Sequence, residues 1–201
     1  MPMIYIVFSI LNAIALFIAA HTHKWMWYVW LFTAVLTGYF FLDRHLYGQL
    51  FVNVLVGLIC IAPLSTWDSD EEINREKITW GSPILAWLES LVIAVLLYIF
   101  FRDTFNNPIF ECMGAGSMVV GMYLLSRKRV AAWIIFIYSF VMFGISSVVI
   151  GDLKGIVTSI MQTVFSVYGL IRYMEFYQDT KEKEIRLKGT WSSNNGNKEV
   201  L

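Results

Sequence analysis

Three amide side chains lie near the middle of long apolar stretches of this sequence: Asn12, Asn53 and Gln162. Tyr138 has a similar depth in another stretch. A polar group in an apolar environment is costly unless it has a partner, so these residues either join helices or bind the hydroxyl and amide groups of a solute. The shared depth predicts a binding site for a small polar molecule. For Asn12 taken alone, an interhelical hydrogen bond is the better interpretation.

Two carboxylates, Glu89 and Glu111, also fall within apolar stretches. A charge inside a membrane-spanning segment is expensive, although the cost falls toward the boundaries, where both residues lie. Glu111 follows Pro108 by three residues, so it either stabilises a helix N-terminus or attracts a cationic solute. We include Glu111 in the expected site. Glu89 belongs to a segment that we expect to lie outside the site.

The elements that position these residues are seven apolar runs of about 18 to 22 residues, the length that an α-helix needs to cross a bilayer. Hydrophobic residues make up 58% of the 201-residue chain and charged residues only 15%. This composition is not that of a soluble domain and predicts an all-α integral membrane protein. The runs are 3–20, 25–42, 46–67, 83–101, 108–126, 130–150 and 153–173.

The basic residues indicate an orientation. Twelve Lys and Arg residues fall in one set of alternate connections and in the tail, whereas the other set contains only Arg44, Arg102 and Lys154. Because basic residues are retained in the cytoplasm, this distribution predicts an N-terminus outside and a C-terminus in the cytoplasm. The net charge of zero indicates no partner, and nothing favours nucleic-acid binding.

An internal repeat appears when the chain is compared with itself at an offset of 106 residues. It places the first three spans on the last three and leaves the fourth as a linker. Because one linker helix separates two three-helix units, the units are expected to be parallel, in a three-plus-one-plus-three plan. The expected units are 1–67 and 108–173, with a loop and linker helix over 68–107 and a cytoplasmic tail over 174–201. The matched landmarks are Trp27 with Trp133, Gly38 with Gly144, and Trp67 with Tyr173.

Small and polar residues recur at helical spacing in the third and seventh spans, and four positions of this stripe match under the same offset. Residues three or four apart share one face of a helix. The face either lines a cavity between the units or lets helices pack closely, since small residues at this spacing also do that. The matched positions are 49 with 155, 53 with 159, 60 with 166, and 67 with 173.

Aromatic residues and helix breakers suggest a gate. Tryptophans near span ends are usually interface anchors, but Trp67 and Trp133 occupy matched positions, where they either close a pathway or stack on a flat ring. Pro63 removes a helix hydrogen bond one turn before Trp67 and predicts a kink, and its partner Gly169 also weakens a helix. We therefore assign Pro63, Gly169 and Tyr173 to the gate.

Several functions find no support. The sequence contains no phosphate-binding loop, no hydrolase motif and no metal-ligand cluster, so we expect no cofactor, no metal and no enzymatic activity. The predicted orientation separates His45 from His21 and His23. Cys60 and Cys112 lie inside spans, where we expect no disulfide.

Four stretches carry a resemblance to a family: Leu46-Tyr47, the triplet Arg127-Lys128-Arg129 followed by Trp133, Tyr168-Gly169, and Arg172-Tyr173, together with Trp67. In these the chain resembles a divergent member of the PnuC-type nicotinamide riboside transporters, whose fold is related to the SWEET sugar transporters. Asn53 stands where that family typically has Gln. The resemblance implies facilitated diffusion of the riboside across the inner membrane, alternating access, and homo-oligomers, trimers in particular.

The resemblance also implies roles for residues. Trp67, Trp133, Tyr138 and Tyr168 would offer aromatic faces to the cationic pyridinium ring. The amides of Asn12, Asn53 and Gln162 would bind hydroxyls, with Glu111 as the attracting charge. The alternatives are another vitamin, such as thiamine or riboflavin, or a membrane scaffold that transports nothing and whose tail binds a partner.

Overall fold

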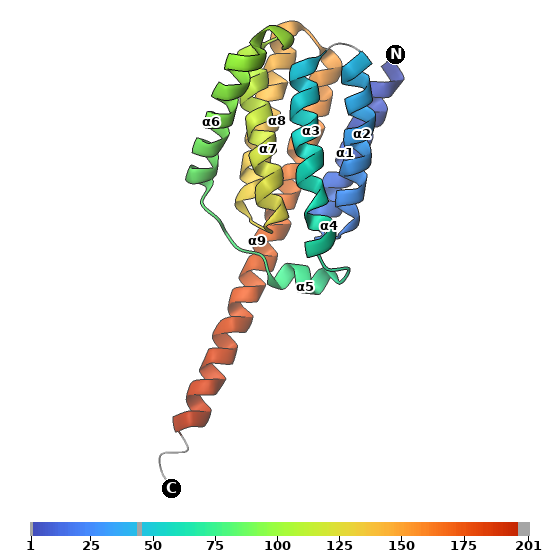
Figure 1. Cartoon of the computed structure of the whole chain (residues 1–201). Helices are drawn as coiled ribbons and strands as arrows, with labels where there is room; N and C mark the ends of the chain where they lie inside the picture. The colour runs from blue at the N-terminus through green and yellow to red at the C-terminus, as the bar shows by residue number, and fades with distance from the viewer. Residues whose placement is uncertain (1, 44–45, 197–201) are drawn as a thin grey trace.

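The computed structural model describes the backbone of residues 2–43 and 46–196, and the side chains of 7–43 and 46–186. Long helices stand side by side in one bundle, and the last of them extends well beyond it (Figure 1). The helices are α1 (Pro2–Ala20), α2 (Trp25–Asp43), α3 (Tyr47–Ile61), α4 (Pro63–Thr66), α5 (Glu71–Glu76), α6 (Pro83–Phe101), α7 (Pro108–Ser126), α8 (Ala131–Ile150) and α9 (Leu153–Gly196), with a 3-10 turn, η1, at Arg102–Thr104.

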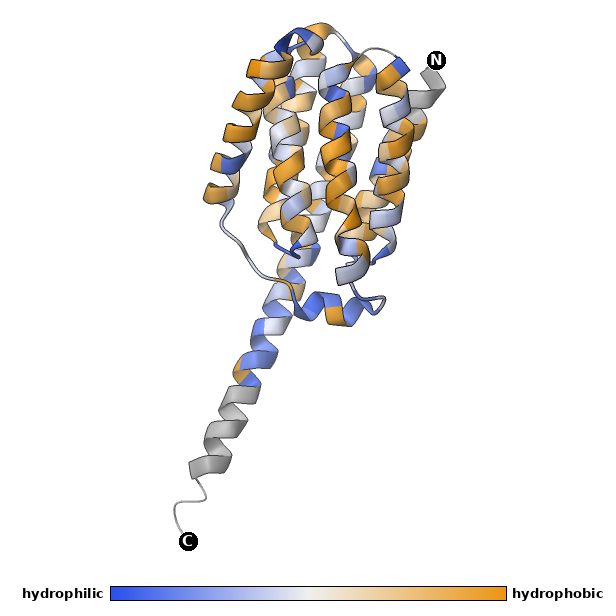
Figure 2. Ribbon diagram, viewed as in Figure 1, coloured by the Kyte–Doolittle hydropathy of each residue, from blue (hydrophilic) through white to orange (hydrophobic). Residues whose placement is uncertain are grey.

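Six helical segments are long and apolar enough to cross a membrane, and α1 is apolar over Val7–Ala20. Figure 2 shows the apolar residues spread over the bundle, while α5 and the coloured part of α9 outside the bundle are mostly hydrophilic. The all-helical membrane architecture predicted from composition is confirmed. The six segments begin at Trp25, Tyr47, Pro83, Pro108, Ala131 and Leu153.

The helices pack in a ring. Each helix contacts the next in the order α1, α2, α3, α7, α8, α9. Helix α9 in turn contacts α1, which completes the ring. Helix α6 packs outside this ring, against α7 and α8. The ring consists of the helices that correspond to each other under the offset of 106 residues. Helix α6, which the sequence predicts to be the linker, lies at its periphery.

Helix α3 breaks where the sequence predicts a kink. It ends at Ile61, and the single turn of α4 begins at Pro63. Proline has no backbone N–H to donate and its ring clashes with the preceding turn, so the helix cannot continue unchanged. Trp67 then adopts an extended conformation and leads the chain toward α5.

Helix α9 differs from the sequence expectation, which ends the last span at Tyr173. The helix continues without interruption to Gly196. Its polar part contains many Glu and Lys residues, which are good helix formers, and Arg186 approaches Glu182 to 3.9 Å one turn earlier. The apolar segment ends well before the helix does, so hydropathy alone places the end of the helix too early.

The connection between α4 and α6 lies across one end of the bundle, which we call the α5 end (Figure 1). The Asn74 amide, fully buried, donates to the carbonyls of Thr22 and Asp68. The N–H of Thr79 donates to the carbonyl of Lys128, and the Thr79 carbonyl accepts from Val130. The connection is thereby attached to both the α1–α2 and the α7–α8 turns.

Gly116 sets the distance between α6 and α7. A Cβ atom there would come within 2.6 Å of the Ser90 carbonyl oxygen and 2.8 Å of the Ala94 nitrogen, both rigid backbone atoms. We expect Gly116→Ala to destabilise the protein by about 1–3 kcal/mol through overpacking, measured as a lower midpoint of thermal unfolding. The matched control is Gly57→Ala, whose Cβ would meet only the Ala34 side chain at 3.6 Å. A loss in the control equal to that at Gly116 would contradict the packing argument.

Candidate functional site

A cavity of about 400 Å³ lies inside the helix ring, within the range of roughly 300–1,000 Å³ typical of small-molecule sites. Its walls come from α1, α2, α3, α7 and α8. Leu46, Asn106 and Asp152, in or beside three connections at the end opposite α5, also line it, so we call this the open end. Polar and aromatic lining residues include Asn12, Trp30, Thr33, Thr37, Gln49, Asn53, Phe105, Glu111, Phe143, Ser146 and Ser147.

Glu111 forms an acidic corner in this cavity. Its Oε1 accepts from the backbone N–H of Asn107 at 3.0 Å and from the Ser146 hydroxyl at 3.2 Å. Its Oε2 accepts from Nε2 of Gln49 at 3.3 Å. Glu111 is 9% exposed, and among the described residues no Lys or Arg lines the cavity. A buried carboxylate with hydrogen-bond donors but no cation is suited to attract a positively charged solute.

Asn53 is fixed to the α2 wall. Its Nδ2 donates to the Ala34 carbonyl, and its Oδ1 accepts from the Thr37 hydroxyl at 2.8 Å. The close approach depends on Gly38, since a Cβ at that position would lie 3.2 Å from Nδ2. An amide has four hydrogen-bonding sites, so this arrangement leaves capacity for a ligand.

Six buried aromatic rings pack in series from the cavity toward the α5 end. Trp30 forms part of the cavity lining, and its ring centroid is 5.7 Å from Trp27 and 6.4 Å from Phe136. We call the whole series the aromatic arc. Its consecutive members are Trp67, Trp27, Trp30, Phe136, Trp133 and Tyr173, with the remaining centroid distances 5.5, 5.9 and 5.3 Å.

The two halves of the arc are related by the offset of 106 residues. Trp67 corresponds to Tyr173, Trp27 to Trp133, and Trp30 to Phe136.

The polar atoms of the arc differ in whether they have a hydrogen-bond partner. Nε1 of Trp67 donates to the Ser126 carbonyl at 3.1 Å. The indole N–H groups of Trp27 and Trp133 and the Tyr173 hydroxyl are buried without a protein partner. Buried donors are normally paired, so these three indicate a functional rather than a purely structural core.

The structure separates the predicted site residues into groups. Asn12, Asn53 and Glu111 line the cavity together. Trp67, Trp133 and Tyr173 lie in the aromatic arc, and Pro63 stands at the helix break. Gly169 lies directly against the Trp133 ring.

The other three predicted residues lie elsewhere. Gln162 is buried in α9 but is not among the cavity residues. Tyr138 borders a narrow groove with Trp87 and Met113, between α6, α7 and α8. The Tyr168 hydroxyl lies 3.3 Å from Nε2 of His21, next to the end of α1.

The sequence interpretation missed the α2 wall. Trp30, Thr33 and Thr37 face the cavity at positions i, i+3 and i+7. This spacing was a usable signal, but Trp30 was treated as an interface anchor because it lies near the start of its span. Position 49 belongs to the polar stripe of the third span, which the sequence assigns either to a cavity or to helix packing, but nothing in the sequence brings Gln49 or Ser146 next to Glu111.

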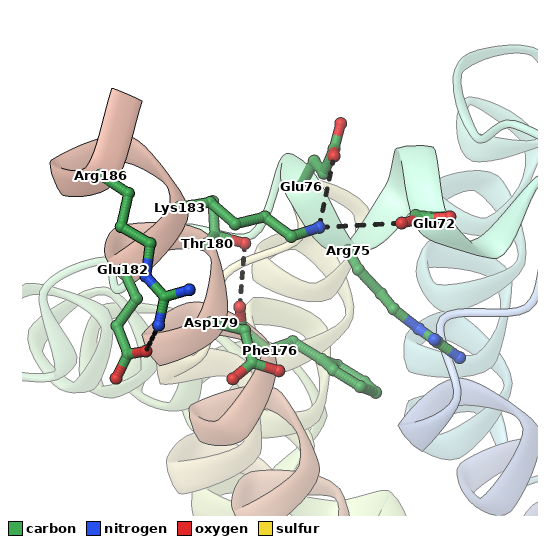
Figure 3. Close-up of a pocket in the computed structure, with 9 residues that line it drawn as sticks. All are labelled: Glu72, Arg75, Glu76, Phe176, Asp179, Thr180, Glu182, Lys183 and Arg186. Carbon is green, nitrogen blue, oxygen red and sulfur yellow. Dashed lines mark hydrogen bonds and ion pairs between the residues drawn. The ribbon is translucent and has the colours of Figure 1, made fainter. Parts of the chain in front are cut away.

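A second hollow, of about 430 Å³, lies between α5 and the polar part of α9. Figure 3 shows Lys183 of α9 reaching toward Glu72 and Glu76 of α5, at 3.7 and 3.9 Å. The side chains of these three residues are more than half exposed. Such pairs contribute little stability, so we treat this hollow as a solvated junction between α5 and α9.

The helix ring encloses a cavity of small-molecule size that carries a buried carboxylate and amides, an arrangement expected of a membrane transporter. The nicotinamide mononucleotide transporter family model matches residues 2–178, and the chain belongs to this family. The crystal structure of the vitamin B3 transporter PnuC superposes with a TM-score of 0.68 at 14% identity, covering 88% of this chain and 83% of that one. No curated protein matches the chain. The family membership inferred from sequence resemblance is confirmed.

The cavity predicts one-sided access. With Cys60 and Cys112 replaced by Ala, we expect Asn53→Cys to react with a water-soluble maleimide from the open-end side of reconstituted vesicles. No comparable reaction is expected from the α5 side, because the aromatic arc separates the two. Ser139→Cys is the control, since Ser139 is fully buried between α8 and α7, and it should stay unlabelled. Equal labelling of Asn53→Cys from both sides would contradict a sealed arc.

Proposed function

We propose that the protein carries nicotinamide riboside across the cytoplasmic membrane by facilitated diffusion and catalyses no reaction. The observation that carries this proposal is the cavity, whose described lining combines a buried carboxylate, four amides and a tryptophan and includes no Lys or Arg. Nicotinamide riboside joins a pyridinium cation to a ribose with several hydroxyls. A site for it needs negative charge or an aromatic face for the ring and hydrogen-bonding groups for the sugar.

Each wall of the cavity matches one part of this solute. Glu111 supplies the counter-charge, and Trp30 offers an aromatic face at the inner limit of the cavity. Asn53 and Asn12 supply hydrogen bonds to the ribose. Oε1 of Gln49 is a buried acceptor with no protein partner, so it can accept from a ribose hydroxyl or from the carboxamide. A phosphorylated nucleotide would meet Glu111 with no cation among the described lining residues, which favours the riboside over its phosphate.

The three-plus-one-plus-three plan with seven spans is part of the proposal. Helices α1, α2 and α3 begin at residues 2, 25 and 47, and α7, α8 and α9 begin at 108, 131 and 153, each 106 residues later. The contact of α1 with α9 is matched by that of α7 with α3, as a twofold relation requires. These facts support units over 1–67 and 108–173, a linker over 68–107 and a tail over 174–201.

The orientation follows the basic residues. The α5 end bears most of the Lys and Arg residues, which favours the cytoplasmic side for it and for the end of α9. The N-terminus and the open end then face outward, and the cavity is poised to receive solute from outside. Association into trimers is carried over from the family resemblance.

Alternating access requires the aromatic arc to open. Pro63, at the break between α3 and α4, and Gly169, against Trp133, are the proposed hinges. Trp67, Trp133 and Tyr173 are the proposed gate. The unpartnered N–H of Trp133 and hydroxyl of Tyr173 are available to the ribose hydroxyls as the solute passes.

The ligand can be identified by tryptophan fluorescence of the purified protein. We expect saturable quenching by nicotinamide riboside, with binding of nicotinamide mononucleotide at least about tenfold weaker because its phosphate faces a carboxylate. Thiamine, another cation, and riboflavin, which is neutral, complete the panel. If thiamine binds best, the proposed substrate is wrong but the proposed cation site stands. If riboflavin or the mononucleotide binds best, the role proposed for Glu111 is contradicted.

Variants test the residues. We expect Glu111→Gln to weaken riboside binding about ten- to a hundredfold, because a hydrogen bond or contact with a charged partner is worth roughly 1.5–3 kcal/mol. The matched control is Glu89→Gln, an exposed carboxylate on α6, which should bind like the wild type. Asn53→Ala should weaken binding while Gln162→Ala, outside the cavity, should not. Normal binding and uptake by Glu111→Gln would argue against this site, whereas a folded wild-type protein that neither binds nor takes up any of these solutes would leave the scaffold alternative.

A further inference from the structure

Lys128 has an unusual backbone conformation in the turn between α7 and α8. Its φ angle is 56°, in the left-handed region. Its N–H donates to the Leu125 carbonyl and the N–H of Arg129 donates to that of Leu124. This pair of bonds is the Schellman ending of a helix, where the left-handed position is usually glycine. A lysine there strains the backbone.

The same ending occurs one repeat earlier. Thr22, which is 106 residues before Lys128, has a φ angle of 63°. Both residues are buried and both carbonyls accept hydrogen bonds from the connection between α4 and α6, from Asn74 and Thr79 respectively. The backbone role is therefore shared by two different residue types, and it does not explain why a long cationic side chain stands at position 128.

The side chain of Lys128 explains its presence. It is 6% exposed, and Nζ lies 5.1 Å from the ring centroid of Trp67, a cation–π geometry. The same turn also accepts the indole N–H of Trp67 through the Ser126 carbonyl. Trp67 terminates the segment that follows the break at Pro63, so the α7–α8 turn fastens the movable end of the first unit to the second.

We propose that Lys128 is the latch of the inner gate: its ammonium group occupies the face of Trp67 and keeps the α5 end closed until a cationic solute competes for that face. This inference rests on the proposed transport function. It adds a positioning residue outside the cavity and a reason for the gate to respond to a cation.

Two features of Lys128 weaken its contact with Trp67: the surroundings of its ammonium group and its backbone conformation. Burial, and then the nearby charge of Lys77, lower the pKa of the Lys128 ammonium, while Asp68 opposes this shift. The charged form is therefore disfavoured where it stands, and the strained backbone adds to this cost. A competing cation therefore displaces the Lys128 ammonium group from the Trp67 ring more readily than it would displace a well-solvated ion pair on an unstrained backbone.

Cys60 provides a reporter for the gate. It is fully buried in the last turn of α3, just before the break at Pro63, and belongs to the same apolar cluster as Trp67. In a Cys112→Ser background we expect Lys128→Met to raise the rate of Cys60 modification by a water-soluble maleimide roughly fivefold, the factor for one partly desolvated cation–π contact. Lys128→Gly should do the same while relieving the strained turn, so a general loss of stability cannot account for the effect.

Two controls isolate the charge on Trp67. Lys128→Arg keeps a cation over the ring and should react like the parent. Arg127→Met removes a cation from the same turn that lies over Tyr123, at 5.6 Å, and should also react like the parent. Unchanged reactivity in both Lys128→Met and Lys128→Gly, or an equal rise in Arg127→Met, would overturn the latch. Because the measurement needs no substrate, it is independent of whether nicotinamide riboside is the solute.

Discussion

The buried carboxylate of Glu111 is the interaction on which the arrangement of the helices around the cavity depends. An anion within the membrane is tolerated only when donors surround it, and here they come from the N-terminus of α7, from Ser146 on α8 and from Gln49 on α3. Satisfying this one group therefore joins α7 to α8 and to the third helix of the other unit. The cavity lies where those helices meet, and in the function that we propose its charge selects the solute.

The two related triplets of helices share architecture and differ in chemistry. Gly38 admits the Asn53 side chain as Gly144 admits that of Ser159, and Trp27 packs on Trp67 as Trp133 packs on Tyr173. The offset nevertheless pairs Gln49 with Gly155 and Asn53 with Ser159, so α3 contributes amides to the cavity that α9 does not. A twofold frame thus builds an asymmetric site, which an asymmetric solute requires.

The closed end combines tight packing with incomplete hydrogen bonding. Six rings bury one another, yet the Trp27, Trp133 and Tyr173 donors lack protein partners. Apolar burial stabilises the closed arrangement, while the unpaired donors and the strained lysine turn lower its advantage over an open one. The gate that we propose needs this balance, because a fully satisfied core would not open and a loosely packed one would leak.

The sequence alone determined the membrane class, the family, the helix break at Pro63 and the offset that relates the helices, because run length, hydropathy and helix breakers act locally. It also identified Asn12, Asn53 and Glu111, whose polarity is conspicuous in apolar runs. Only the tertiary structure decided which neighbours they have. The ring places α2 and α3 opposite α7 and α8, so Trp30, Thr37 and Gln49 face the cavity, whereas Gln162 on α9 does not. Periodicity tells which residues share a face of a helix, but the packing of all helices decides which face meets the cavity.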